Sequence, residues 1–274
     1  MYNSSPMRIL RKLLMVFGLL FIAAGAISSF IGELTGFVVF SGLQNLLISC
    51  MGVVIFWLSL ERVHPEGYKF FLIFIALSSL LGFFYFPLGI LGFLLTIFVL
   101  WFFRDPERIV PSPEAGIISP ADGVICKIEK TFPPEEVKSS EELLKISVFM
   151  NVFNVHVNRS PMSGTISKRN YIPGLFFNAS LDKASKENER LSLVMNVNNK
   201  IKIAFVQIAG LLARRIVNEA QEGNKLVTGE IFGIIRFGSK VDVYIPIGSK
   251  INVLKGQTSI AGETILAEIN PKKK

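Results

Sequence analysis

The sequence predicts a membrane-anchored protein in which N-terminal transmembrane α-helices precede a mainly-β domain, of the barrel or sandwich type within the α+β class. Half of the 274 residues are hydrophobic and the mean hydropathy is +0.49, which is high for a soluble protein. The apolar excess lies in the first 103 residues, and from Ile109 onward short β-prone segments alternate with turns. We therefore divide the chain into a transmembrane region, 1–103, and a second domain, 104–274.

The first region contains enough apolar sequence for about four membrane-spanning helices. Leu13–Ile31 is uncharged and long enough to cross a bilayer at roughly 20 residues. Gly36–Leu60 is a second span, and the polar loop Glu61–Lys69 after it is expected to expose His64. Phe70–Phe103 is too long for one span, so it predicts a helical hairpin that turns near Pro87.

The basic residues favour one orientation in the membrane. Four crossings place the basic N-terminus, the loop with Arg62 and Lys69, and the chain after Arg104 on one side. The positive-inside rule makes that side cytoplasmic, so we expect a multi-pass protein of the cell (inner) membrane. The formal net charge of +8 then suits an anionic lipid leaflet better than nucleic acid.

Cysteine and histidine usage argues against disulfides and metals. Cys50 lies in an apolar segment and Cys126 in the second domain, so we expect no disulfide between them. No Cys/His cluster has zinc spacing, and no metal is expected.

The second domain is predicted to be rich in antiparallel strands, with one helical piece at Leu181–Arg190 that contains several Lys, Glu and Ala residues. The expected strands are Gly123–Ile128, Leu144–Met150, Gly164–Ile166, Ile201–Ile208, Ile231–Phe237, Val241–Ile245 and Ile251–Leu254.

The pair Gly238-Ser239 sits between two of these strands and is the first candidate for chemistry. It is typical of an ordinary tight turn, and the pattern predicts strand, turn, strand. A strained turn would also allow the Ser239 hydroxyl to attack the Gly238 carbonyl, which glycine leaves accessible. Elimination from the resulting ester and hydrolysis would leave a pyruvoyl group at the new N-terminus.

Four other residues could take part in a reaction. His156 is the only histidine of the second domain and its ordinary carrier of protons near neutral pH, although a lone histidine is also often structural. Asp122 precedes a glycine in a turn, and could instead orient the imidazole or help to deprotonate Ser239. Arg214 and Arg215 form either a phosphate-binding pair or a solvated charge pair.

Six separated blocks resemble the phosphatidylserine decarboxylase family in its short form, over roughly residues 100 to 260. The blocks are Phe102–Arg108, Ser119–Gly123, Phe149–Gly164, Asn178–Ser185, Gln207–Gly210 and Phe237–Asp242. The resemblance implies a carboxy-lyase made as a proenzyme and cleaved between Gly238 and Ser239. A large chain, 1–238, would then remain with a small chain, 239–274.

By the same resemblance, Ser239 becomes a covalent pyruvoyl cofactor. Its ketone forms a Schiff base with the amine of phosphatidylserine and accepts electrons as CO2 leaves, giving phosphatidylethanolamine. Ser239, His156 and Asp122 are the implied catalytic residues, and the partner is a phospholipid in the membrane. Arg159 stands where the longer form of the family has a second histidine, which leaves the full cleavage triad in doubt.

Two alternatives to this function remain. The same chemistry could act on another serine phospholipid, such as an archaetidylserine with ether chains. The stretch Lys255–Gly262 is also similar to biotinyl- or lipoyl-type modules, which would make the domain a non-catalytic carrier. That module would leave the Gly238-Ser239 pair without a role. A homo-oligomer is compatible with either alternative.

Overall fold

The computed structural model describes residues 62–112, 116–137, 141–177, 184–198, 201–210, 215–236 and 239–269. Of the predicted span Leu13–Ile31 only isolated helical positions are described, and Gly36–Leu60 lies outside the described residues. The chain divides into two units, one of Met1–Ile73 with Arg104–Pro106 and one of Phe74–Phe103 with Glu107–Lys274. In the first unit, β1 (Arg62–Val63) pairs with β2 (Arg104–Asp105).

The helical hairpin begins earlier than predicted. α3 runs from Pro65 to Phe84, because Pro65 lacks an N–H and suits the first helical position. His64 precedes it and accepts hydrogen bonds at its backbone oxygen from Gly67 and at Nδ1 from Glu66. His64 is only 4% exposed, so the prediction of an exposed loop histidine is wrong.

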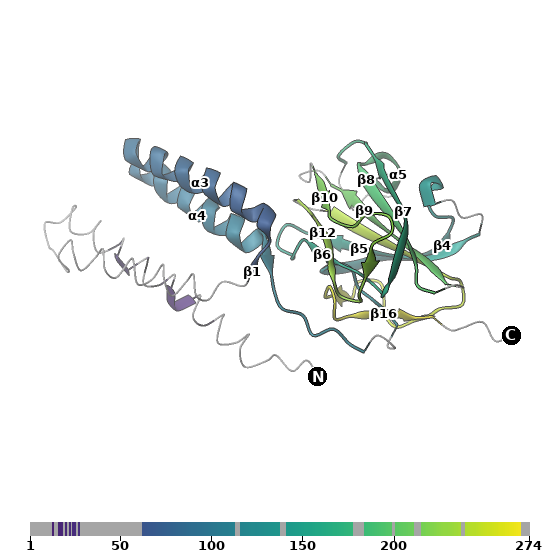
Figure 1. Ribbon diagram of the computed structural model, residues 1–274. Coiled ribbons are helices and arrows are strands. Elements are labelled where there is room, and N and C mark those ends of the chain that lie inside the picture. Colours follow the sequence, from purple (N-terminus) through teal and green to yellow (C-terminus); the bar gives the residue numbers. More distant parts are fainter. Residues whose placement is uncertain are drawn as a thin grey trace, which may run out of the picture. The chain divides into compact units, whose positions relative to one another are not determined.

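The predicted turn of the hairpin is confirmed. Tyr85 is extended and separates α3 from α4 (Phe86–Phe102). The second half of α3 packs against α4 (Figure 1), where a Cβ on Gly89 would lie 2.5 Å from the Cα of Gly82. Among the described helices, α3 alone is long and apolar enough to cross a membrane, and α4 is a shorter apolar helix.

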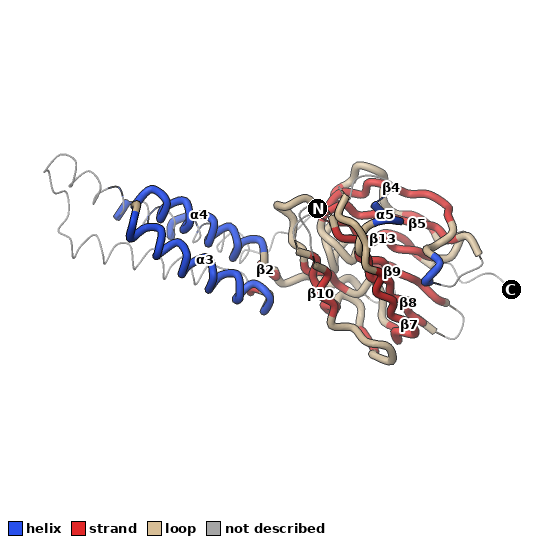
Figure 2. The backbone as a smooth tube through the Cα atoms, turned by 90° about the horizontal axis from the view of Figure 1, so that it is seen from above, coloured by secondary structure: helices blue, strands red, loops and turns tan. Residues whose placement is uncertain are grey.

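The rest of the second unit is mainly β, as predicted. An eight-stranded antiparallel sheet has the order β11-β7-β8-β9-β13-β5-β4-β15, and Figure 2 shows β4, β5, β13, β9, β8 and β7 side by side. Its strands are β4 (Gly123–Thr131), β5 (Leu143–Met150), β7 (Gly164–Ile172), β8 (Arg190–Asn196), β9 (Lys202–Ala209), β11 (Lys225–Leu226), β13 (Ser239–Ile245) and β15 (Thr258–Ser259).

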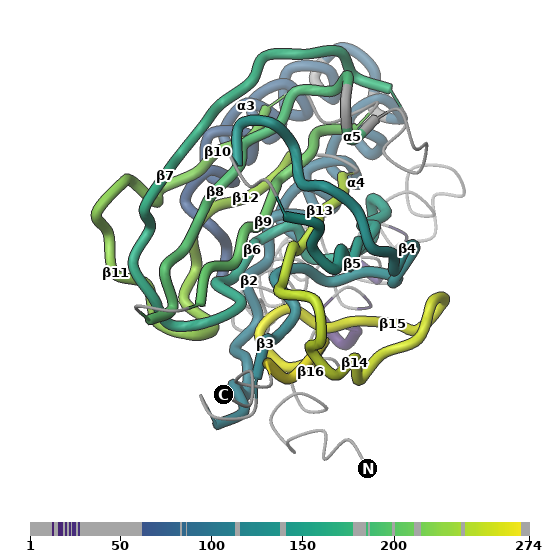
Figure 3. Tube along the Cα trace, turned by 90° about the vertical axis from the view of Figure 1, so that its right-hand side faces the viewer, coloured from purple at the N-terminus to yellow at the C-terminus, as the bar shows by residue number. Residues whose placement is uncertain are grey.

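Two three-stranded sheets complete this unit, and Figure 3 shows β3, β14 and β16 near β15. One has the order β10 (Ile216–Asn218), β12 (Ile231–Ile235), β6 (Val157–Arg159), and the other β14 (Lys250–Ile251), β16 (Ile265–Glu268), β3 (Ile117–Ile118). Two short helices, η2 (Glu135–Val137) and α5 (Ala184–Glu187), join the strands. One large hydrophobic core takes residues from all three sheets, including Phe205 of β9, Phe232 of β12 and Leu266 of β16.

Two sequence-based predictions need correction. The predicted helix Leu181–Arg190 is helical over Ala184–Glu187 among its described residues, and strand β8 begins at Arg190. The strands on either side of Gly238-Ser239 do form, but they are not partners in a hairpin. β12 pairs with β10 and β6, whereas β13 pairs with β5 and β9 in the large sheet.

Candidate active site

Ser239 is the first residue of β13, in the middle of the large sheet. It faces Met150 of β5 on one side and Ala209 of β9 on the other. Its side chain is fully buried, and Oγ lies 4.0 Å from the sulfur of Met150. Two neighbouring strands thus fix its backbone, while among the described residues its hydroxyl has one weak hydrogen bond, to that sulfur. Gly238 and Phe237 lie outside the described residues.

His156 is distant from this serine in sequence, but its backbone lies beside the end of β12, the strand that precedes Ser239. Its backbone oxygen accepts a hydrogen bond from Ile235, the last residue of β12, at 3.3 Å. Only three residues separate Ile235 from Ser239, so the chain leaves one sheet beside His156 and enters the next at Ser239. The structure therefore places His156 beside the last residue of β12 and Ser239 at the first residue of β13, the next strand along the chain.

The surroundings of the His156 ring define which nitrogen can act as a base. The ring is fully buried, and its Nδ1 lies 2.9 Å from the backbone oxygen of Asn154. A carbonyl oxygen can only accept, so Nδ1 carries the hydrogen and Nε2 holds the lone pair of the neutral ring. The ring packs on Phe102 of α4, with 4.3 Å between centroids.

A chain of three amides, two buried and the third half-buried, runs from the same core. Asn158 donates to the sulfur of Met150 at 3.7 Å and accepts from Gln207 at 2.8 Å. Gln207 in turn accepts from Asn218 at 2.9 Å. The sulfur next to Ser239 is therefore linked to polar groups that are themselves held in place. The sequence analysis placed Asn158 and Gln207 in blocks that resemble the family but gave these amides no role, although Gln207 inside an apolar strand is a recognisable signal.

Asp122 lies in a different set of contacts from the one predicted. Its Oδ2 is 2.9 Å from the Arg108 guanidinium, and its Oδ1 accepts from the backbone N–H of Ala261 at 2.7 Å. Both side chains of this ion pair are largely buried. Neither oxygen of Asp122 bonds to His156 or Ser239 among the residues that the structure describes. It joins the segment after α4 to the C-terminal part of the chain.

Of the two candidate arginines, the structure describes Arg215. Arg214 lies outside the described residues. Arg215 is exposed, and its backbone oxygen accepts a hydrogen bond from Arg236 at 3.3 Å. Arg215 is thus close in space to the segment that leads to Ser239.

The other face of β13 carries charge. Lys240 donates to the Ser185 hydroxyl at 2.6 Å, and that hydroxyl donates to Oδ2 of Asp242 at 3.2 Å. Lys240 and Asp242 are 5% and 0% exposed, with 4.0 Å between the ammonium and Oδ1. The serine therefore bridges a buried ion pair. The sequence analysis missed this cluster because Ser185 is 55 residues away from Lys240.

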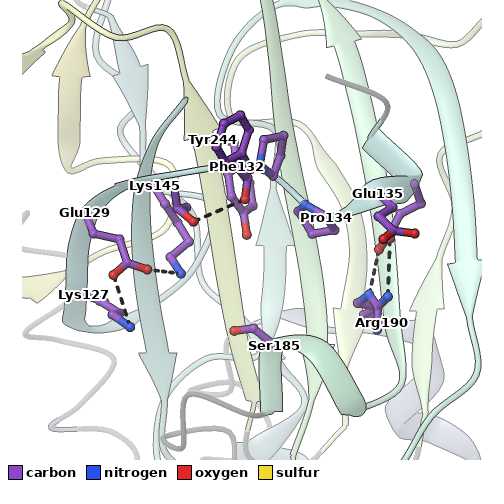
Figure 4. Close-up of a pocket in the computed structure, with 12 residues that line it drawn as sticks. Lys127, Glu129, Phe132, Pro134, Glu135, Lys145, Ser185, Arg190 and Tyr244 are labelled. Carbon is purple, nitrogen blue, oxygen red and sulfur yellow. Dashed lines mark hydrogen bonds and ion pairs between the residues drawn. The ribbon is translucent and has the colours of Figure 1, made fainter. Parts of the chain in front are cut away.

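A cavity of about 780 Å³ lies on this charged face of the sheet (Figure 4). Ser185 and Tyr244 line it, and Glu136 and Arg190 form a salt bridge of 2.7 Å at its wall. Burial alone would raise the pKa of Glu136, but hydrogen bonds from Arg190 and Ser192 outweigh it, so that pKa is lowered. Burial raises the pKa of the Tyr244 hydroxyl, and Asp242 adds to the effect.

The arrangement includes the buried hydroxyl of Ser239 and the buried imidazole of His156, whose Nδ1 is held by the Asn154 carbonyl. It lacks a metal centre among the described residues, where no group of three His, Cys, Asp or Glu side chains is close enough to hold an ion.

Comparisons with known proteins agree with the resemblance of the sequence blocks. The family model described as phosphatidylserine decarboxylase matches residues 95–267. The phosphatidylserine decarboxylase proenzymes of Rickettsia akari (strain Hartford) and Rickettsia felis (strain ATCC VR-1525 / URRWXCal2) are each 52% identical to this chain over 212 residues, which cover 77% of this chain and 92% of the relative. That of Rickettsia prowazekii (strain Madrid E) is 51% identical over the same lengths. The chain therefore belongs to the phosphatidylserine decarboxylase family and is an enzyme of the carboxy-lyase class.

Proposed function

We propose that this protein decarboxylates phosphatidylserine to phosphatidylethanolamine, with a pyruvoyl group formed from its own Ser239. The observation that carries the proposal is the place of Ser239, fully buried at the start of the central strand and just after a glycine. Membership in the family supports the lipid substrate, and the relatives' name of proenzyme supports activation by cleavage. Membership in the family also favours an enzyme over the biotinyl- or lipoyl-type module.

The proposed cleavage uses only atoms of the chain and one water. The Ser239 hydroxyl oxygen bonds to the Gly238 carbonyl carbon, the peptide C–N bond breaks, and the hydroxyl proton moves to the amine. Loss of the Ser239 α-proton and breakage of its Cβ–Oγ bond release the Gly238 carboxylate. Water then replaces the nitrogen, which leaves as ammonia.

The surroundings of Ser239 fit a pyruvoyl group. Its hydroxyl lies 4.0 Å from the sulfur of Met150, so no strong hydrogen bond to a described residue is lost when the hydroxyl is removed. The backbone ladders to Met150 and Ala209 hold the new chain end in place. When present, the ketone supplies the electron sink for the loss of CO2.

For His156 we propose two proton transfers. Its Nε2 accepts the proton of the Ser239 hydroxyl during cleavage, and later donates one to the substrate carbon that has lost CO2. The Asn154 carbonyl keeps Nδ1 protonated, and the Phe102 ring fixes the plane of the imidazole.

For Asp122 the contacts favour positioning. It binds the guanidinium of Arg108 and the backbone of Ala261, which belongs to the proposed small chain. Direct help in cleavage, the role first expected, requires a contact with His156 or Ser239, and the two roles are separable by mutation.

The proposed chains 1–238 and 239–274 would remain associated after cleavage. β13 pairs with β5 and β9 of the large chain, β15 pairs with β4, and β16 pairs with β3. These ladders join the small chain to the large one through several strands, and β13 is buried along its whole length, so separation would require unfolding.

We also propose that residues 1–103 anchor the enzyme as about four membrane spans, with residues 104–274 on the cytoplasmic side of the cell membrane. The apolar hairpin of α3 and α4 supports the last two spans.

Arg214 and Arg215 are proposed to bind the lipid phosphate, because Arg215 lies beside the segment that leads to Ser239. A homo-oligomer stays a prediction.

The test compares Ser239→Ala with Ser249→Ala, since Ser249 also follows a glycine but lies in the turn between β13 and β14. We expect the wild type and Ser249→Ala to run as two fragments on a denaturing gel and to turn over phosphatidylserine. Ser239→Ala should stay whole and inactive. Normal cleavage or turnover in Ser239→Ala would end the proposal. Parallel assays with ester- and ether-linked serine lipids identify the preferred substrate.

A further inference from the structure

The turn between β5 and His156 presents an aromatic side chain on a rigid support. Three hydrogen bonds within Asn151–Asn154 hold it, from Asn154 N to Asn151 O, from Asn151 N to Asn154 Oδ1, and from Phe153 N to Asn151 Oδ1. At the tip, Phe153 is 63% exposed. Because hydrogen bonds already hold the backbone of this turn, presenting Phe153 to another surface does not require the ordering of a loose loop.

This turn lies beside the last turn of α4. Phe102 and Phe103, at the end of the helix, are fully buried, and Phe102 packs on the His156 ring. Trp101 lies 6.1 Å from Phe153 between ring centroids. The turn and the end of the helix are therefore neighbours in space.

The exposed surface of α4 is apolar, with Leu91 and Leu94 at 54% and 56% exposure. Such a helix fits the hydrocarbon of a bilayer, and a tryptophan in its last turn is typical of the membrane–water interface. Because Phe153 neighbours Trp101, the apolar surface of the helix continues directly onto the turn.

We propose that the turn Asn151–Asn154 is a second contact with the phospholipid bilayer, in which Phe153 enters the interfacial layer beside Trp101. The inference rests on the proposed anchoring of α3 and α4 in the membrane. The same turn supplies the Asn154 carbonyl that holds Nδ1 of His156. Contact with the lipid surface thus places the proposed base at the level where a lipid headgroup arrives.

Phe132 offers a matched control. It is 61% exposed, close to the value of Phe153, but it lines the cavity on the charged face of the large sheet. Two equally exposed phenylalanines thus differ in whether an apolar helix end is beside them.

The experiment places one fluorescent label at a time in the full-length enzyme, reconstituted in phosphatidylethanolamine–phosphatidylglycerol vesicles. Phe153→Cys, Phe132→Cys and Leu94→Cys are made in a background with Cys50 and Cys126 replaced by serine, and cleavage into two chains confirms folding. Lipids with nitroxides near the headgroup or deep in the acyl chain then quench the labels. We expect shallow quenching at position 153, deep quenching at position 94 and little at position 132.

If the label at position 94 is quenched but the label at position 153 is quenched no more than the one at position 132, the proposed lipid contact of Phe153 is wrong and the anchoring stands. Little quenching at both position 94 and position 153 would overturn the anchoring as well.

A second experiment needs no label. Phe153→Ser should raise the half-saturating mole fraction of phosphatidylserine in vesicles by about tenfold, with a smaller change in kcat, as loss of one buried aromatic contact allows. Phe132→Ser should not. Equal effects of the two variants would also contradict the proposal.

Discussion

The two faces of strand β13 are both buried, but they differ in polarity and charge. Ser239, Val241 and Val243 are buried and lie on the face that meets the hydrophobic core. On the opposite face, Lys240 and Asp242 form an ion pair bridged by Ser185. One strand thus keeps its reactive candidate on an apolar face and its charges on the other. Among the described residues, the Ser239 hydroxyl has no strong hydrogen-bond partner to lose in a reaction, whereas the paired charges hold the strand in place.

The largest expected effect concerns the apolar face, where His156 is the proposed proton carrier. His156→Gln should lower turnover by about 10²–10⁴-fold, the usual contribution of a positioned acid or base. Turnover of phosphatidylserine by purified enzyme is the measurement. His64→Gln is the control, since that buried histidine instead caps the start of α3. If both variants lose activity equally, His156 has a structural role only.

The next effect concerns the charged face. Lys240→Met should destabilise the fold by about 3–5 kcal/mol, because it leaves the carboxylate of Asp242 buried without its counter-charge. Adding Asp242→Leu should restore most of that loss. Urea unfolding of detergent-solubilised protein measures both. Lys250→Met, which removes an exposed ion pair with Glu268, should cause no measurable change. Similar losses at Lys240 and Lys250 would refute the structural role of the charged face.

A smaller effect separates the two roles of Asp122. If it only joins Arg108 to Ala261, Asp122→Asn and Arg108→Gln should each cost about 1.5–3 kcal/mol, with little further loss in the double variant. Both variants should still be cleaved. Gel analysis of cleavage decides the matter. A block of cleavage in Asp122→Asn alone would assign Asp122 to the reaction instead.

The smallest effect is on pH dependence. The folded-state pKa of Glu136 is lowered by Arg190 and Ser192, despite burial, from an ordinary value of 4.5. Its contribution to stability is therefore present above pH 4.5 and is lost as the pH falls through the folded pKa. Glu136→Gln should flatten the acid limb of stability against pH, measured by unfolding in urea below and above that value. An unchanged acid limb would contradict this.

The sequence allowed prediction of features that depend on local pattern. Leu144–Met150 and Ile201–Ile208 alternate or run apolar, and both are strands to within one residue. Pro87 between apolar runs predicted the hairpin, and Gly238-Ser239 with His156 gave the main candidates of the site. Strand β8 was missed because its start, Arg190, follows a stretch rich in Lys and Glu that is typical of a helix.

Features that depend on distant parts of the chain were not predictable. Asp122 meets Ala261 139 residues later, and its bond to Arg108 has no signal in local sequence. The pairing of β12 and β13 with different strands is likewise a matter of tertiary structure, since a Gly-Ser pair between apolar runs suggests a hairpin. The packing of Phe102 on His156 belongs to the same group.

The central claim is that the chain cleaves itself before Ser239 and converts that residue into a ketone. The most direct measurement is the intact mass of each polypeptide in a purified, active preparation. We expect two polypeptides, the smaller matching residues 239–274 less the mass of one ammonia. A single polypeptide of 274 residues, or a small fragment that begins with an ordinary serine, in material that still releases CO2 from phosphatidylserine, would contradict the account.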